Sequence, residues 1–114
     1  MTRRAALMVA VVVLGWPALA AAQDKALIER GMKVYVDQKC SVCHSIDGKG
    51  NAKGPLDSVG LKLSADEIRE WMVHPAEMTK KTNAVRKPPM RAYPNLPKED
   101  LDAVVAYMLS LKKK

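Results

Sequence analysis

Apolar residues recur at helical spacing in three segments of the chain. Between residues 24 and 37, Ile28, Gly31, Met32 and Tyr35 stand at positions i, i+3, i+4 and i+7, which is the pattern of one apolar helix face. A glycine inside a helix costs about 1 kcal/mol relative to alanine. The place of Gly31 within the apolar stripe therefore predicts that another backbone segment passes close to the first helix.

A second helix is predicted from Ser64 to about Val73. It opens with "SADE", in which a serine hydroxyl precedes Glu67 by three residues, and this is the signature of a capping box. Pro75 marks the end of this helix, because the residue before a proline disfavours the helical conformation. The side expected to be buried carries Ile68, Trp71 and Met72.

The last predicted helix opens at Pro97 and runs to the lysines at 112–114. Acidic residues lie near its positive end and the lysines lie at its negative end, as the helix dipole favours. The segments at 44–63 and 75–96 are rich in Gly, Pro and Lys and are predicted to be loops. Because no segment alternates with a period of two, we predict an all-α fold.

The first 22 residues have the pattern of a secretory signal peptide. Two arginines precede an unbroken apolar run at 5–14, and the small-residue stretch "ALAAAQ" follows. Cleavage after Ala22 would leave a single domain at 23–114 in the bacterial periplasm. The alternative is an uncleaved anchor facing the periplasm, since residues 5–22 carry no charge, although Gly15 and Pro17 interrupt the apolar run.

The composition of the mature domain limits its function. Its 92 residues are near the lower size at which a hydrophobic core suffices, and the chain has no Phe, so we expect a non-protein group to complete the core. Once Arg3 and Arg4 are removed, 17 basic and 12 acidic residues give a net charge of +5, which suits an acidic partner. Nucleic acid is an improbable partner, because no aromatic residues are interleaved with the basic ones.

The stretch "CSVCH" holds both cysteines of the chain, Cys40 and Cys43, with His44 directly after them. This is the attachment motif for c-type haem. Two thiols at this spacing can form thioether bonds to the two vinyl groups of one porphyrin. His44 then lies below the ring, where a neutral imidazole nitrogen can bind iron.

Three other interpretations of the motif are weaker. A redox-active pair of cysteines would require a strand-helix setting, and no strand is evident. A zinc site needs four ligands, and only His74 remains, at no familiar spacing. A disulfide in a binding module explains the cysteines but leaves the histidine without a role.

The other face of the iron decides the function, because an open face permits gas binding or peroxide chemistry and a second protein ligand makes an electron carrier. Met32, Met72 and Met108 fall on helix faces, so Met78 and Met90 remain as candidates, with His74 as a further one. Met90 is favoured because it follows two prolines in "RKPPMRAYPNLP", and prolines restrict the mobility of a loop.

Taken together, "CSVCH", the "GP" at 54–55 and "KPPMRAYPNLPKEDLDAVVAYMLSL" resemble the monohaem class I cytochromes c over nearly all of the mature chain. The resemblance implies three or more helices wrapped around one covalent haem c, with iron held by His44 and Met90. It also implies that the first and last helices cross at Gly31, with Tyr35 and Tyr107 near the crossing.

The resemblance further implies that the carbonyl of Pro55 accepts a hydrogen bond from the proximal histidine. Such a bond would fix the orientation of the His44 ring. The chain departs from the family here, because Leu56 follows Pro55 directly where the family often has one more residue. The loop is therefore expected to be one residue shorter.

We predict a monomeric periplasmic one-electron carrier that is not an enzyme and serves redox proteins. Between Met78 and Arg91 the chain has five basic residues and no acidic one, which predicts docking to the acidic surface of an oxidase or a dehydrogenase. This basic run consists of Lys80, Lys81, Arg86, Lys87 and Arg91. The alternatives are a haem-based sensor of small ligands and an electron-transfer subunit of a larger dehydrogenase or oxidase complex.

Overall fold

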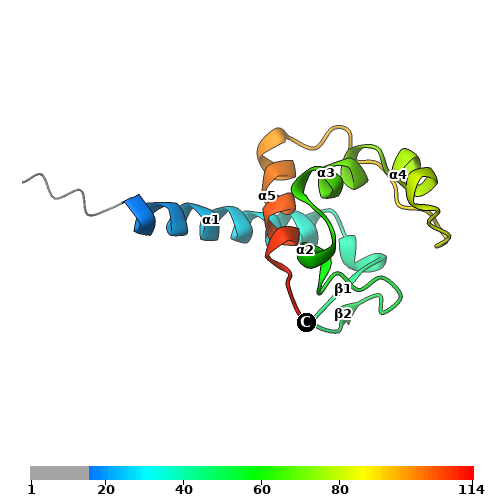
Figure 1. Cartoon of the computed structure of the whole chain (residues 1–114), viewed down its shortest axis with the longest axis horizontal. Helices are drawn as coiled ribbons and strands as arrows, with labels where there is room; N and C mark the ends of the chain where they lie inside the picture. Colours follow the sequence, from blue (N-terminus) through cyan, green and yellow to red (C-terminus); the bar gives the residue numbers. More distant parts are fainter. Residues whose placement is uncertain (1–15) are drawn as a thin grey trace, which may run out of the picture.

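The fold is helical, with one very small sheet (Figure 1). A computed structural model describes the backbone of residues 16–114 and the side chains of residues 24–114. The elements are α1 (Trp16–Asp37), the 3-10 helix η1 (Cys40–Val42), β1 (Ser45–Ile46), β2 (Lys49–Gly50), α2 (Val59–Lys62), α3 (Ala65–Val73), α4 (Pro75–Thr82) and α5 (Lys98–Ser110). The two strands pair antiparallel, and the all-α class is confirmed.

Helices α1 and α5 cross at Gly31, as predicted (Figure 1). A Cβ atom on Gly31 would overlap the carbonyl oxygen of Ala103 and lie 2.7 Å from the Cβ of Tyr107. Tyr35 stacks on Tyr107 one turn away, with 5.9 Å between the ring centroids and an interplanar angle of 13°. The glycine therefore allows two helix backbones to touch.

Helix α1 begins at Trp16, earlier than the predicted start near residue 24. The alanines between Trp16 and Gln23 favour a helix, and they extend it through the expected cleavage point. Residues 1–15 of the expected signal peptide lie outside the described residues, so its cleavage stays a prediction. Within the described part of the chain, no helix has both the length and the apolar character needed to cross a bilayer.

The cap of α3 agrees with the prediction. The backbone N–H of Glu67 donates to the Ser64 hydroxyl at 3.2 Å, and the Ser64 N–H donates to the Glu67 carboxylate at 3.0 Å. Helix α5 starts directly after Pro97 and ends at Ser110, before the terminal lysines.

The prediction that 44–63 and 75–96 are loops throughout is wrong. The first segment contains β1, β2 and α2, and the second contains α4. Pro75 ends α3 and also occupies the first turn of α4, where a missing N–H costs nothing because it would have no helical partner. Pro75 therefore separates α3 from α4 and begins the second of these helices.

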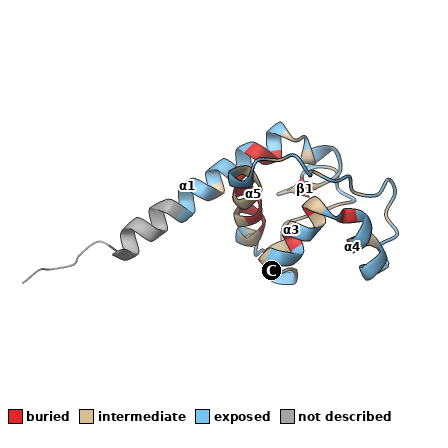
Figure 2. Ribbon diagram, turned by 90° about the horizontal axis from the view of Figure 1, so that it is seen from above, coloured by how far each residue is buried: buried red, intermediate tan, exposed pale blue. Residues whose placement is uncertain are grey.

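The core lies where α1, α3 and α5 meet (Figure 2). Tyr35, Ile68, Val105, Tyr107 and Met108 form one buried cluster, and Val34, Met72 and Val104 form another. Helix α5 contributes to both clusters, so it serves as the central element. The segments after α1 and after α4 pack around this core and leave a cavity between them.

Burial of Tyr35 predicts a loss of stability in alkali. Burial raises the pKa of its hydroxyl from 10.0 to about 12. The pKa of Tyr35 is higher in the folded protein than in the unfolded one. Its contribution to the free energy of unfolding is therefore fully present below pH 10 and is lost as the pH rises towards 12. Denaturant unfolding at several pH values should show a shallower alkaline loss in Tyr35→Phe than in the unchanged protein. Equal slopes in both proteins would contradict this expectation.

Candidate functional site: a cavity behind the CSVCH motif

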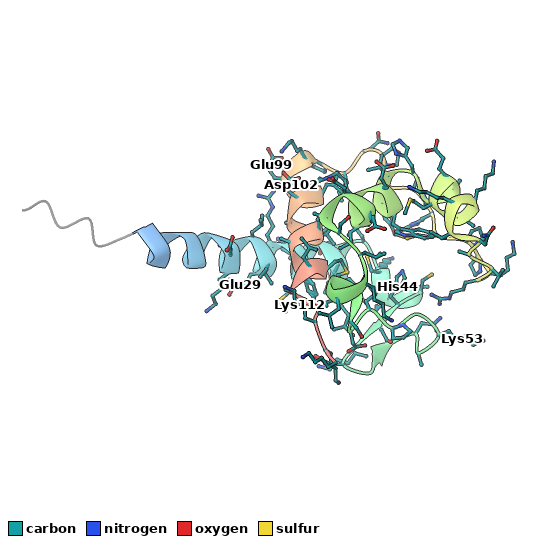
Figure 3. All side chains as sticks on the ribbon, viewed as in Figure 1. Glu29, His44, Lys53, Glu99, Asp102 and Lys112 are labelled. Carbon is teal, nitrogen blue, oxygen red and sulfur yellow. The ribbon has the colours of Figure 1, made fainter. Side chains whose placement is uncertain are left out.

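A cavity of about 650 Å³ opens behind the cysteine motif. Its volume is in the range of pockets that hold small molecules and cofactors. Cys40, Cys43, His44 and Met90 all line it, so four of the predicted site residues come together from two distant segments. His44 lies on the segment between η1 and β1, far from the N-terminal end of α1 (Figure 3).

Helix η1 sets the direction of the two thiols. Lys39 takes a left-handed conformation (φ 56°) that ends the course of α1, and the chain turns into η1. The N–H groups of Cys43 and His44 both donate to the Cys40 carbonyl, at 3.1 and 2.9 Å. Residues three apart in a 3-10 turn eclipse one another, so both thiols lie on one side of the turn. Both are free, with Cys40 partly buried and Cys43 exposed.

The hydrogen bond that orients His44 goes to Gly54, and the prediction of Pro55 as its partner is wrong. The Nδ1 atom of His44 lies 3.1 Å from the Gly54 carbonyl oxygen. The Ser45 N–H also donates to that oxygen, at 3.0 Å, which aligns it with the histidine. Pro55 is exposed and lies outside the cavity wall. The physical reason is the parallel bridge between Ser45 and Pro55, which turns the Gly54 carbonyl towards residues 44–45. Successive carbonyls of an extended segment point to opposite sides, so that of Pro55 faces away.

His44 is held in the form that binds metals. Burial lowers its pKa, and the Arg86 guanidinium lowers it further, while the hydrogen bond to Gly54 acts in the opposite direction. With Nδ1 donating to the carbonyl, the neutral imidazole has its lone pair on Nε2. That nitrogen is available as a ligand.

Asn51 holds the cysteine motif through two hydrogen bonds, and no sequence pattern predicted this role. Its side-chain amide donates to the Val42 carbonyl at 3.1 Å, and its backbone N–H donates to the His44 carbonyl at 2.9 Å. One residue thus bonds to backbone carbonyls on both sides of Cys43.

Met90 enters the cavity wall from the segment between α4 and α5. It is partly buried and packs against the cluster of Val34, Met72 and Val104. After it, the Tyr93 N–H donates to the Met72 carbonyl at 2.8 Å and ties the segment to α3. Two further methionines, Met72 and Met108, also line the cavity, although the sequence assigned them only to the core.

The rival ligands lie elsewhere. Met78 is buried in α4 and lies outside the cavity wall. His74 is half-exposed at the junction of α3 and α4, where its Nδ1 lies 2.9 Å from a Glu70 carboxylate oxygen. Glu70, His74 and Glu77 together form an exposed group. One possible metal-ligating atom from each lies within 4.8 Å of those of the other two. The hydrogen bond to Glu70 accounts for the position of His74.

The side chains that line the cavity suit a flat, apolar cofactor with negatively charged groups at its edge. Most lining residues are apolar, Trp71 among them, and the charged ones are Lys39, Arg86 and Arg91. No carboxylate of the described residues lines the cavity. A porphyrin with two vinyl groups and two propionates would fit this set, with Cys40 and Cys43 to hold its vinyl groups and the exposed cations Lys39 and Arg91 to offset its propionates.

Comparisons with known proteins show the family of the chain. The family model described as "Cytochrome c" matches residues 28–112. The chain is 30% identical to cytochrome c oxidase subunit 2 of Alkalihalophilus pseudofirmus over 96 residues, which is 77% of the chain and 27% of that protein. It is 40% identical to cytochrome c-555 of Methylococcus capsulatus over 55 residues, 47% of the chain and 44% of that protein.

These matches span under half the length of both curated relatives. No solved structure matches the chain significantly. The family match covers most of the sequence and includes the cysteine motif, the cavity wall and α5. The chain therefore belongs to the cytochrome c family, as a class I c-type cytochrome.

Proposed function

We propose that the chain is a periplasmic one-electron carrier, with one haem c joined to Cys40 and Cys43 and its iron bound by His44 and Met90. Membership of the cytochrome c family implies haem-based electron transfer by a covalent haem c. The observation that carries the finer proposal is that these four side chains line one apolar cavity.

The haem supplies a one-electron couple of iron when bound. The protein residues set its environment: Gly54 orients the imidazole of His44, and Met90 offers a thioether. Ligation by Met and His raises the reduction potential relative to two histidines. Apolar walls act in the same direction, because the oxidised site carries more charge.

Electrons would pass through the mouth of the cavity. We define the mouth by its exposed lining residues. Five of them are uncharged, namely Val42, Cys43, Ala84, Pro88 and Pro89, and two are basic, namely Lys39 and Arg91. The basic run lies beside it, with Lys80 and Lys81 in the last turn of α4. Arg86 and Arg91 also line the cavity. An apolar mouth with a basic border favours a redox partner with an acidic surface.

Electron transfer to an anionic oxidant should therefore slow as salt is added. With hexacyanoferrate(III) as probe, we expect the second-order rate to fall roughly tenfold between about 0.01 and 0.15 M ionic strength. The double variant Lys80→Gln, Lys81→Gln should lose more of this dependence than the control Lys25→Gln, Lys33→Gln on α1. Stopped-flow measurements compare them, and equal salt dependence in the two variants would refute the basic run as a docking site.

A second candidate is a module of a larger oxidase complex. One relative is named as a subunit of cytochrome c oxidase, and the match covers only part of it. Size-exclusion chromatography of gently solubilised membranes distinguishes the two. A free carrier elutes at its own mass in the periplasmic fraction, whereas a subunit stays with the membrane complex.

Carbon monoxide tests the carrier function against a sensor. With Met90 on iron, the ferrous protein should bind carbon monoxide slowly, because a ligand must leave first. An open face would bind the gas rapidly. Rapid binding in the unchanged protein would exclude the proposed ligation.

A further inference from the structure

Arg86 joins the two segments that supply the proposed iron ligands. Its guanidinium packs on Gly54: a Cβ atom on Gly54 would overlap the Arg86 Nη1 atom and lie 3.0 Å from its Cζ atom. Gly54 is the residue whose carbonyl accepts the hydrogen bond from His44. Arg86 is partly buried and lines the cavity together with His44. A Cβ atom on Gly54 would also overlap the Cys43 carbonyl oxygen, so the absence of a side chain there leaves room for both neighbours.

The same segment continues to Met90, four residues later. Beyond Met90, the Arg91 Nε–H donates to the Tyr93 hydroxyl at 3.1 Å, and Tyr93 is bonded to α3 through the Met72 carbonyl at 2.8 Å. Met90 thus lies between two points at which its segment contacts the rest of the protein. Arg86 holds the segment to the histidine loop, and Tyr93 holds it to α3.

The positive charge of Arg86 lies in the cavity wall, where it can change the reduction potential of bound iron. Among the described residues that line the cavity no carboxylate offsets it. A fixed positive charge beside partly buried iron favours the ferrous state, because that state carries one positive charge fewer. The effect of one charge depends on its distance and burial, so a cation packed into the wall should act more strongly than an exposed one.

We propose that Arg86 is a positioning residue that clamps the Met90 segment to the Gly54 loop and raises the reduction potential of the site. This inference rests on the proposed ligation by His44 and Met90. It goes beyond that ligation because it names what holds the two ligand segments at a fixed separation. A planar guanidinium that packs beside a glycine with both a nitrogen and its central carbon is suited to such a clamp, and the single ammonium group of a lysine is not.

The test uses the haem-loaded protein and the variants Arg86→Gln and Arg86→Lys. The control is Lys53→Gln, which removes the same charge beside Gly54 from an exposed side chain that extends from the outer edge of the loop (Figure 3). One readout is the reduction potential. The other is the denaturant concentration at which the ferric protein loses the red charge-transfer absorption of methionine-bound iron.

We expect Arg86→Gln to lower the potential by roughly twice the shift of Lys53→Gln or more, and to lose the methionine absorption at lower denaturant. Arg86→Lys should recover most of the potential but not the resistance to denaturant. If Arg86→Gln and Lys53→Gln behave alike in both readouts, or Arg86→Lys restores both, the clamp is refuted. If the unchanged protein lacks the methionine absorption, the proposed ligation fails instead.

Discussion

Replacing Met90 by leucine should lower the reduction potential by on the order of 100 mV or more, within the span of about 0.8 V over which axial ligands act. Leucine nearly conserves the volume of methionine, so the packing against Val34, Met72 and Val104 is kept while the sulfur donor is lost. The ferric protein should lose its red charge-transfer absorption, and the ferrous protein should bind carbon monoxide rapidly. Potentiometry and flash photolysis measure the two effects.

The matched controls are Met72→Leu and Met108→Leu, because both side chains line the same cavity and are buried. Each should leave the methionine absorption in place and change the potential far less. If one of them abolished the absorption and Met90→Leu did not, the sixth ligand would have to be reassigned to that helix.

Replacing Gly31 by leucine should destabilise the haem-loaded protein by about 3 kcal/mol or more. Leucine gains about 1 kcal/mol of helix propensity over glycine, but its Cβ alone would overlap the Ala103 carbonyl and approach Tyr107. A backbone carbonyl cannot move aside as a flexible side chain can. Helices α1 and α5 must therefore separate, which also disturbs the stack of Tyr35 on Tyr107.

Met32→Leu is the control for Gly31→Leu, since Met32 is the next residue of α1 and is 49% exposed. Its free energy of unfolding should stay within about 0.5 kcal/mol of the unchanged protein. Denaturant unfolding compares the three proteins. A Gly31→Leu protein as stable as the Met32→Leu protein would show that the helices do not meet at this glycine.

Several features could be predicted from the sequence because each depends on a local rule. The Ser64 cap needs only its own turn, and it formed as expected. Gly31 was informative because a glycine lowers the stability of a helix, so its presence on an apolar helix face indicates that a close neighbour requires it. The spacing of Cys40, Cys43 and His44 predicts covalent haem attachment, since few other sites use two thiols and an imidazole in this order, and that attachment stays a prediction.

Other features depend on packing between distant segments. The entry of Met72 and Met108 into the cavity wall follows from how α3 and α5 pack, and helix periodicity indicates only that they are buried. The contact of Arg86 with Gly54 joins two segments that no pattern relates. The choice of Gly54 over Pro55 as acceptor depends on the pairing of Ser45 with residues 54–56, which the sequence does not reveal.

The most direct test of the central claim is the intact mass of the purified protein, denatured, after expression with the haem-attachment machinery. We predict the mass of the polypeptide from residue 23 to 114 plus one haem. The denatured protein should keep its haem absorption, because two thioether bonds hold the group to Cys40 and Cys43. A mass equal to that of the amino acids alone would contradict the account.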